Sequence, residues 1–157
     1  MTRMLCLTLL LFPILAAAST PVEVGAPLPA LTYKDQHDAS HALNAQTKAV
    51  IFSAERDVSS LVETALEDQT TASLEAAGIL YVADISAMPG IITSVIALPK
   101  MRKRPYPMLL GRSPEDTATL PREAGKITLI EADAGTITAI RFLPDAAALR
   151  SALGLTP

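Results

Sequence analysis

At residues 49–54 the sequence reads Ala49-Val50-Ile51-Phe52-Ser53-Ala54, a short segment dominated by consecutive large apolar side chains. A continuous run of this kind is typical of a central parallel strand that is covered on both faces. From Val58 to Ala77 apolar residues recur near helical spacing and Gly78 follows, which predicts a single helix. Ile79 to Ile85 is apolar again and predicts a second strand. Strand, helix and strand in this order predict a right-handed crossover in a parallel sheet.

Shorter elements are predicted on both sides of this unit. Upstream, Pro21 to Pro29 contains several prolines and a glycine and is expected to be extended. It leads into a strand at Leu31 to Tyr33 and a polar turn at Lys34 to Ser40. Downstream, Gly90 to Leu98 predicts a shorter helix that ends at Pro99.

The last third of the chain predicts a different succession of elements. It comprises a short strand at Tyr106 to Leu110, a helix start at Ser113 to Asp116, a strand at Ile127 to Ile130, a turn at Ala132 to Gly135, a strand at Thr136 to Phe142 and a helix from Asp145 to Leu153. The turn between the last two strands predicts an antiparallel hairpin.

The composition fits one folded domain. The chain has 157 residues, of which 50% are hydrophobic and 18% charged, enough apolar material for a packed core. Its formal net charge of −3 argues against nucleic acid as the main partner, because phosphate binding needs a broad basic surface. The chain has no Trp and few other aromatic residues, so it lacks obvious stacking platforms for bases or sugars.

The N-terminus predicts export. Arg3 is followed by an apolar run from Met4 to Leu15 and then by the small residues Ala16 to Ser19, the pattern of a secretory signal peptide. The run is too short for a membrane span and contains Pro13. We predict a signal peptide at residues 1–18 and a single domain at 19–157, located in the periplasm or secreted, with no stable membrane span after cleavage. The alternative is an uncleaved anchor.

These features resemble a family. They are the extended Val24-Gly25-Ala26-Pro27-Leu28-Pro29, the strand ending at Ala54, the long helix, Tyr81-Val82-Ala83-Asp84 and the final hairpin and helix. Together they look like a secreted thioredoxin-like domain, nearer the peroxiredoxin variant. Tyr106 to Leu110, Lys126 to Ile130 and Gly135 extend the resemblance to nearly the whole domain. It implies an α/β, three-layer fold with a central mixed sheet ending in an antiparallel hairpin and a C-terminal helix.

The chain departs from this family at its reactive cysteine. In the family this cysteine follows the first central strand at a helix N-terminus, where the helix dipole stabilises a thiolate. Here the stretch is Glu55-Arg56-Asp57-Val58-Ser59-Ser60, and the only cysteine, Cys6, lies in the predicted signal peptide. Aligned on Phe52, Asp57 and Ser60 occupy the places of a Cys-x-x-Cys pair. We therefore expect no thiol oxidoreductase or peroxidase activity. Asp57 is also a good helix cap, which is its simplest role.

The functional interpretation of the same helix N-terminus is a polar binding groove. The resemblance places Pro107 or Pro121 at the family's cis-proline, which lines the substrate groove, and Arg122 beside it. The candidate groove thus comprises Asp57, Ser60, Pro107, Pro121 and Arg122.

Asp35-Gln36-His37-Asp38-Ala39-Ser40-His41 gathers both histidines with two carboxylates. Such ligands suit zinc or copper, so His37, His41, Asp35 and Asp38 form an alternative metal site. The plainer interpretation is a solvated surface turn between strands, in which the histidines meet only if the turn is helical.

Lys100-Met101-Arg102-Lys103-Arg104 concentrates positive charge in an acidic chain. We call Lys100, Arg102, Lys103 and Arg104 the basic loop. It is either a solvated loop or a docking patch for a carboxylate-rich partner, a phospholipid headgroup or phosphate. The resemblance implies that it approaches the same sheet edge as Asp57.

No pattern supports a cofactor. The sequence contains no Gly-x-Ser-x-Gly and no glycine-rich phosphate loop, so no cofactor is expected. The sequence therefore predicts a redox-inactive protein-binding or assembly factor with a protein partner in the periplasm. The alternatives are a periplasmic metal-binding protein or metal-dependent enzyme that uses His37 and His41, and a non-thiol hydrolase that uses Asp57 or Glu55, although no partner base is evident.

Overall fold

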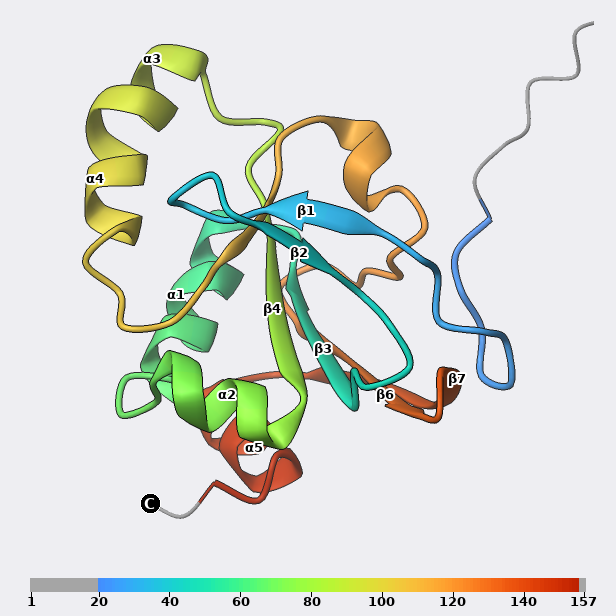
Figure 1. Ribbon diagram of the computed structural model, residues 1–157. Coiled ribbons are helices and arrows are strands. Elements are labelled where there is room, and N and C mark those ends of the chain that lie inside the picture. The colour runs from blue at the N-terminus through green and yellow to red at the C-terminus, as the bar shows by residue number, and fades with distance from the viewer. Residues whose placement is uncertain (1–19, 156–157) are drawn as a thin grey trace, which may run out of the picture.

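Seven strands form one mixed sheet in the order β2-β1-β5-β4-β3-β6-β7 (Figure 1). This computed structural model describes residues 20–155, and the predicted signal peptide at residues 1–18 lies outside them. The strands are β1 (Thr32–Lys34), β2 (Ser40–Ala42), β3 (Ala49–Ser53), β4 (Ile79–Asp84), β5 (Leu109–Gly111), β6 (Ile127–Asp133) and β7 (Thr136–Leu143). The helices are α1 (Arg56–Ala65), α2 (Thr71–Ala77), α3 (Gly90–Ile92), η1 (Thr93–Ala97), α4 (Leu98–Met101), η2 (Pro114–Thr117) and α5 (Ala146–Ala152).

The centre of the sheet is parallel. β4 pairs in parallel with β3 on one side and with β5 on the other, while β6 runs antiparallel to β3. β6 and β7 form the predicted hairpin, with a register shift between Glu131 and Ala132. The predicted parallel pair and antiparallel hairpin are therefore both present.

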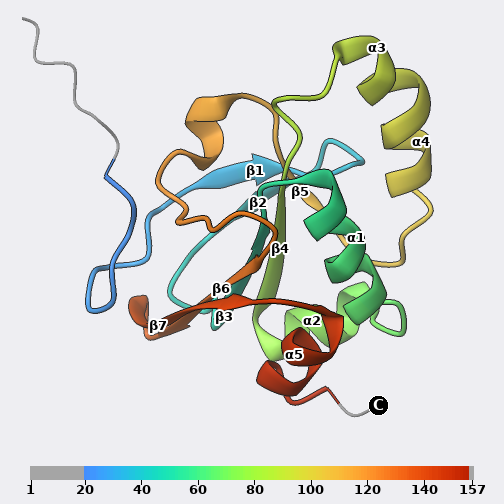
Figure 2. The same ribbon diagram turned by 180° about the vertical axis from the view of Figure 1, so that it is seen from behind.

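Two hydrophobic cores cover the two faces of the sheet. Ile51 packs with α1, α2 and α5 on one face, whereas Val50 and Phe52 pack on the other with Tyr33 of β1 and the chain around Leu120. This double burial explains the continuous apolar run of β3. Figures 1 and 2 show α1, α2 and α5 together on one side of the sheet, and η2 and the N-terminal segment on the other. The predicted α/β fold class with three layers is confirmed.

The predicted helix from Val58 to Ala77 is in fact two helices. α1 ends at Ala65 and α2 begins after Thr70, whose side chain accepts a hydrogen bond from the Ser73 backbone N–H while the Ser73 side chain caps the Thr70 N–H. This capping box starts a new helix in the middle of a pattern that looks continuous. Gly78 ends α2 in the left-handed conformation, with φ 68°, as the sequence predicts.

The predicted helix at Gly90 to Leu98 extends further than expected. Helical structure runs through α3, η1 and α4 to Met101, so Pro99 does not end it. η1 has π-helical hydrogen bonding immediately before Pro99. A π segment changes the hydrogen-bonding register where the proline ring would clash with a preceding carbonyl, which allows the helix to continue.

Several strands differ from the prediction. β6 runs to Asp133, into the predicted turn at Ala132 to Gly135. The polar turn was expected to run to Ser40, but Ser40–Ala42 forms β2, which pairs with β1. β1 and β5 both begin later than predicted, at Thr32 and Leu109. Within residues 20–155, no helix has the length and apolar character needed to cross a membrane.

Candidate functional site

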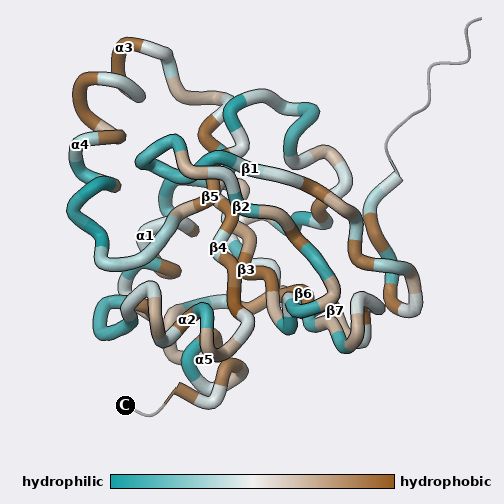
Figure 3. Tube along the Cα trace, in the orientation of Figure 1, coloured by the Kyte–Doolittle hydropathy of each residue, from teal (hydrophilic) through white to brown (hydrophobic). Residues whose placement is uncertain are grey.

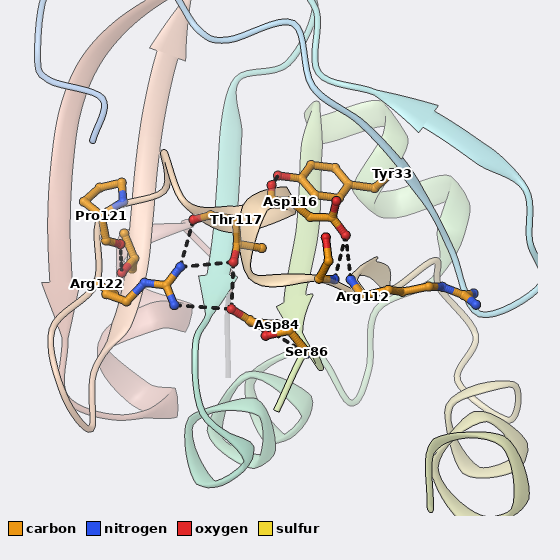
Figure 4. A network of polar contacts seen from close by, with 10 residues as sticks. Tyr33, Asp84, Ser86, Arg112, Asp116, Thr117, Pro121 and Arg122 are labelled. Carbon is orange, nitrogen blue, oxygen red and sulfur yellow. Dashed lines mark hydrogen bonds and ion pairs between the residues drawn. The ribbon is translucent and has the colours of Figure 1, made fainter. Parts of the chain in front are cut away.

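Asp84, the last residue of β4, is the centre of a polar network at the carboxyl ends of the parallel strands. Its Oδ1 accepts hydrogen bonds from the Ser86 N–H at 2.9 Å and the Ser86 hydroxyl at 2.6 Å. Its Oδ2 accepts from the Thr117 hydroxyl at 2.7 Å and from Arg122 Nη1 at 3.2 Å. Figure 4 shows these side chains pointing toward one another. In open α/β sheets, this edge is the usual place for ligands.

Arg122 closes the network from the loop before β6. Its Nη2 donates to the Thr117 carbonyl at 2.8 Å and to the Thr117 hydroxyl at 3.0 Å. Its guanidinium carbon lies 5.2 Å from the centre of the Phe52 ring, within range of a cation–π contact. Arg122 is therefore held by three elements, although 44% of its side chain remains exposed.

The environment of Asp84 keeps it ionised. Burial opposes its charge, but the hydrogen bonds from Ser86 and Thr117 and the charge of Arg122 outweigh that effect and hold its pKa below the ordinary 3.8. The Asp84 side chain is only 7% exposed, so the arginine is the counter-charge of a nearly buried carboxylate.

A second cluster lies beside the first (Figure 4). Asp116 Oδ2 accepts from the backbone N–H groups of Arg112 and Ser113, and the Tyr33 hydroxyl donates to the Asp116 carbonyl at 2.8 Å. Burial opposes ionisation of Asp116, but the backbone hydrogen bonds hold its pKa below its ordinary value. Lys34, Asp38 and Arg112 line a neighbouring shallow hollow of about 340 Å³.

The N-terminus of α1 is where the resemblance in sequence would place a reactive cysteine. Glu55 is the residue before the helix, not Asp57, and its side chain makes no capping hydrogen bond. Asp57 lies exposed in the first turn, and the Ser60 hydroxyl donates to the Arg56 carbonyl at 3.3 Å. Asp57 therefore does not cap the helix, which corrects the simplest interpretation of that residue.

Beneath this helix start, hydroxyl groups form a chain. The Ser53 oxygen lies 2.9 Å from both the Tyr81 and the Ser59 oxygens, and the Ser59 hydroxyl donates to the Glu55 carbonyl at 3.1 Å. Since each hydroxyl has one hydrogen, Tyr81 donates to Ser53 and Ser53 donates to Ser59. Burial raises the pKa of Tyr81, so its hydroxyl stays protonated.

The predicted groove residues are only partly brought together. Arg122 lies in the loop before β6, and that loop reaches α1 where the Gly125 N–H donates to Glu55 Oε1 at 3.3 Å. The Pro121 carbonyl accepts from the Thr128 hydroxyl. Pro107 precedes the start of β5, at the opposite end of that strand from the polar network. Every peptide bond in the described part of the chain is trans, so neither proline is a cis-proline.

The basic loop also lies elsewhere than expected. Arg102 Nε donates to the Gln36 carbonyl at 2.9 Å, Arg104 pairs with Glu63 in the second half of α1, and the Pro105 carbonyl accepts from Thr71 at the start of α2. These contacts place the loop along the side of α1 rather than at its N-terminus beside Asp57. The implied approach to the edge near Asp57 is therefore wrong.

The residues of the metal alternative hold a hairpin together. Asp35 Oδ1 accepts from the N–H groups of His37 and Ala39, and Asp35 Oδ2 lies 2.9 Å from His41 Nε2. Burial opposes ionisation of Asp35, but these hydrogen bonds lower its pKa. Asp38 pairs with Arg112. Among residues 20–155, no group of three or more His, Cys, Asp or Glu is arranged to hold a metal ion.

Several residues of these clusters have no counterpart in the sequence prediction. Asp84 could have been found, because it ends a predicted parallel strand, where polar side chains gather. Thr117 gives no such signal. Gln36 was expected to be solvated but is 1% exposed, and it bonds the Tyr106 carbonyl and the Met108 N–H.

Comparisons with solved structures identify the architecture. A candidate protein disulfide isomerase from Bacteroides thetaiotaomicron superposes with a TM-score of 0.58 at 18% identity, covering 85% of this chain and 87% of that one. A peroxidoxin from Mycobacterium tuberculosis gives 0.55 at 14% identity, covering 84% and 94%.

The thioredoxin domain of a thiol-disulfide oxidoreductase from Bacteroides vulgatus gives a TM-score of 0.52 at 15% identity, covering 86% of this chain and 99% of that one. The chain has a thioredoxin-like fold. At these identities the likeness concerns the fold alone. No protein-family model matches the sequence, and no curated protein matches it.

Within this thioredoxin-like fold, the groups of the polar network bond mainly to one another. Its carboxylates bind their own neighbours, and its hydroxyls donate to protein acceptors. The network presents a partly exposed arginine, fixed by Asp84 and Thr117, at the carboxyl ends of the parallel strands.

Proposed function

We propose that this chain is an exported, redox-inactive thioredoxin-like domain that acts as a protein-binding or assembly factor in the periplasm. The observation that carries the proposal is the stretch Glu55-Arg56-Asp57-Val58-Ser59-Ser60 at the start of α1, where the fold would place a reactive cysteine. Neither a carboxylate nor a hydroxyl at this place can exchange a disulfide.

The internal bonding of the site supports a binding role. Asp84 has four hydrogen-bond contacts within the protein, and Arg122 is fixed by Asp84 and Thr117. Groups that are already hydrogen-bonded within the protein form a rigid surface, which lowers the entropic cost of binding a partner.

Redox inactivity is tested by turnover assays. The purified chain should neither reduce insulin with dithiothreitol as electron donor nor consume hydrogen peroxide above the rate without protein. A Cys6→Ser variant is the control, because Cys6 is the only cysteine. Turnover by both proteins would contradict redox inactivity, and turnover by the native chain alone would assign it to Cys6.

Binding is tested by affinity capture from a periplasmic extract of the native host. We expect a partner at a fixed ratio to the chain that is absent from beads without it. Reproducible failure to capture any protein would contradict the binding role. Stoichiometric metal in the purified chain would instead favour the alternative built on His37 and His41.

A further inference from the structure

The helical segment from Gly90 to Met101 exposes an apolar stripe. Ile91, Ile92, Val95 and Ile96 are 78%, 42%, 68% and 54% exposed. The other side of the segment carries Leu98 and Met101, which pack, together with Met88 just before the segment, against the core that holds α1. Single exposed apolar residues need no explanation, but a contiguous group on one helix marks an interaction surface.

The stripe continues into positive charge. Pro99, Lys100 and Lys103 are also exposed, whereas Arg102 bonds the Gln36 carbonyl and Arg104 pairs with Glu63. From residue 85 to residue 114 the sequence has no Asp or Glu and five Lys or Arg, although the whole chain is acidic. Figure 3 shows the hydrophobic part of this segment at α3 and η1 and the hydrophilic part beyond α4. Lys100 and Lys103 are therefore the basic-loop charges left to meet a partner.

We propose that Ile91, Ile92, Val95, Ile96, Lys100 and Lys103 form the docking stripe for a helix of another protein that is apolar at one end and carboxylate-rich at the other. The inference rests on the proposed binding function and names the surface and the partner's chemistry. The carboxylate-rich end of the partner helix is inferred from charge complementarity with Lys100 and Lys103. Its apolar end is inferred from the four aliphatic side chains of the stripe.

A bilayer fits this pattern less well. A helix that lies in a membrane interface separates apolar and basic residues by depth, around its circumference, and often carries Trp or Phe on the buried side. Here the apolar and basic residues follow one another along the segment, and the apolar ones are all Ile or Val. β-branched side chains lose little rotamer freedom when they pack, which suits a helix–helix contact.

A second copy of the chain fits poorly as well. Parallel pairing of two stripes would bring the lysines of one copy against those of the other. Antiparallel pairing would bury lysines against isoleucines without a counter-charge. Both arrangements are costly, because desolvated charges need partners of opposite sign.

The test uses the fact that Cys6 is the only cysteine in the sequence. In the full chain with Cys6→Ser, a single cysteine is placed at Val95, at Asp57 or at the exposed β7 residue Thr138, and each is labelled with benzophenone-maleimide. After irradiation in a periplasmic extract of the native host, the cross-linked peptides are mapped by mass spectrometry. We expect Val95→Cys to cross-link to an acidic, amphipathic helical segment of another protein and Thr138→Cys to give no such product.

Other products overturn the proposal. Cross-linking of Val95→Cys to a second copy or to lipid would show that the stripe binds another partner than the one proposed. Absence of a Val95→Cys product would show that the stripe is not a docking surface. A product from Asp57→Cys alone would keep the binding function but move its site to the groove. Absence of products from both positions would contradict the binding function too.

Affinity for the mapped segment then tests the charges. Binding of a synthetic peptide of that segment should weaken roughly tenfold or more when Lys100→Glu and Lys103→Glu are combined. The matched control, Lys48→Glu with Arg141→Glu, reverses two exposed charges outside the stripe and should change binding less than about twofold. Equal effects of the two double variants would show that net charge, not the stripe, governs binding.

Discussion

Ser53 is a polar residue in an otherwise apolar, fully buried strand. Its hydroxyl accepts from Tyr81 and donates to Ser59, so it connects the core to the start of α1. The Tyr81 side chain is fully buried, and a buried hydroxyl without a partner is more costly than a hydroxyl that has been removed. The two partners of the Tyr81–Ser53 hydrogen bond are therefore expected to differ in how much stability is lost when each is replaced.

Replacement of Ser53 should cost more than replacement of Tyr81. Ser53→Ala leaves the Tyr81 hydroxyl unpaired and should lower the free energy of unfolding by about 2 kcal/mol, whereas Tyr81→Phe should lower it by about 1 kcal/mol. Urea unfolding of both variants and of the double variant measures this, and the double variant should lose less than the sum. Additive losses would contradict the chain of hydroxyls.

Asp84 should contribute to acid sensitivity. Its folded pKa lies below its ordinary value of 3.8, so the folded state favours the carboxylate, and this stabilisation is present above that value. It is lost as the pH falls below 3.8 through the folded pKa. Urea unfolding between pH 6 and pH 2.5 should show a steeper loss below pH 4 for the native chain than for Asp84→Asn.

The control for this pH series is Asp133→Asn, at an exposed carboxylate at the end of β6. It should keep the native slope. If Asp84→Asn also follows the native slope, the hydrogen bonds from Ser86 and Thr117 do not stabilise the carboxylate.

At the scale of elements, β5 is positioned by a close approach to η2. A Cβ at Gly111 would lie 2.4 Å from Cγ2 of Thr117, far inside van der Waals contact. Thr117 is fully buried and its hydroxyl bonds Asp84 and Arg122, so it has little freedom to move. The glycine at the end of β5 thus allows the polar network to form.

Gly111→Ala should therefore destabilise the fold by about 1–3 kcal/mol, the usual cost of overpacking a core. Thr117→Ser removes Cγ2 but keeps the hydroxyl, so the double variant should recover part of that loss. Thermal and urea unfolding of the single and double variants measure the coupling free energy between Gly111 and Thr117. Strict additivity would mean that the methyl group is not the source of the clash.

At the scale of the whole molecule, strand order decides where the helices lie. β3, β4 and β5 follow one another across the sheet in a single direction. Right-handed crossovers that step in one direction place their connections on the same face. The helices of both crossovers thus share one side, and the other side is covered by the N-terminal segment and the chain around Leu120. The docking stripe is the outer surface of the second crossover.

The full chain should be processed on export. We expect the protein isolated from the periplasm of its host to begin at Ser19, because Ala16 and Ala18 provide the small residues that signal peptidase requires. N-terminal sequencing or intact mass measures this, and Ala16→Asp with Ala18→Asp should block cleavage. Native protein that retains residues 1–18 would support the uncleaved anchor instead.

The sequence by itself predicted the central strands, the hairpin and the C-terminal helix. Each is encoded locally: Val50 to Phe52 is apolar in succession because both faces are covered, and turn residues precede Thr136. The sequence also placed its only cysteine at Cys6, outside the helix start. Asp57 and Arg122 were selected by resemblance, and Arg122 does lie in the polar network at the edge of the sheet.

Only the tertiary structure decided which polar groups meet. Asp84, Thr117 and Arg122 come from three separate segments, and their hydrogen bonds depend on the order of the strands, which no local pattern encodes. The same holds for Gln36, which is buried because β1 packs against β5, and for the basic loop, which contacts the side of α1. Local periodicity reports how a segment is buried, whereas long-range contacts depend on which segments the fold brings together.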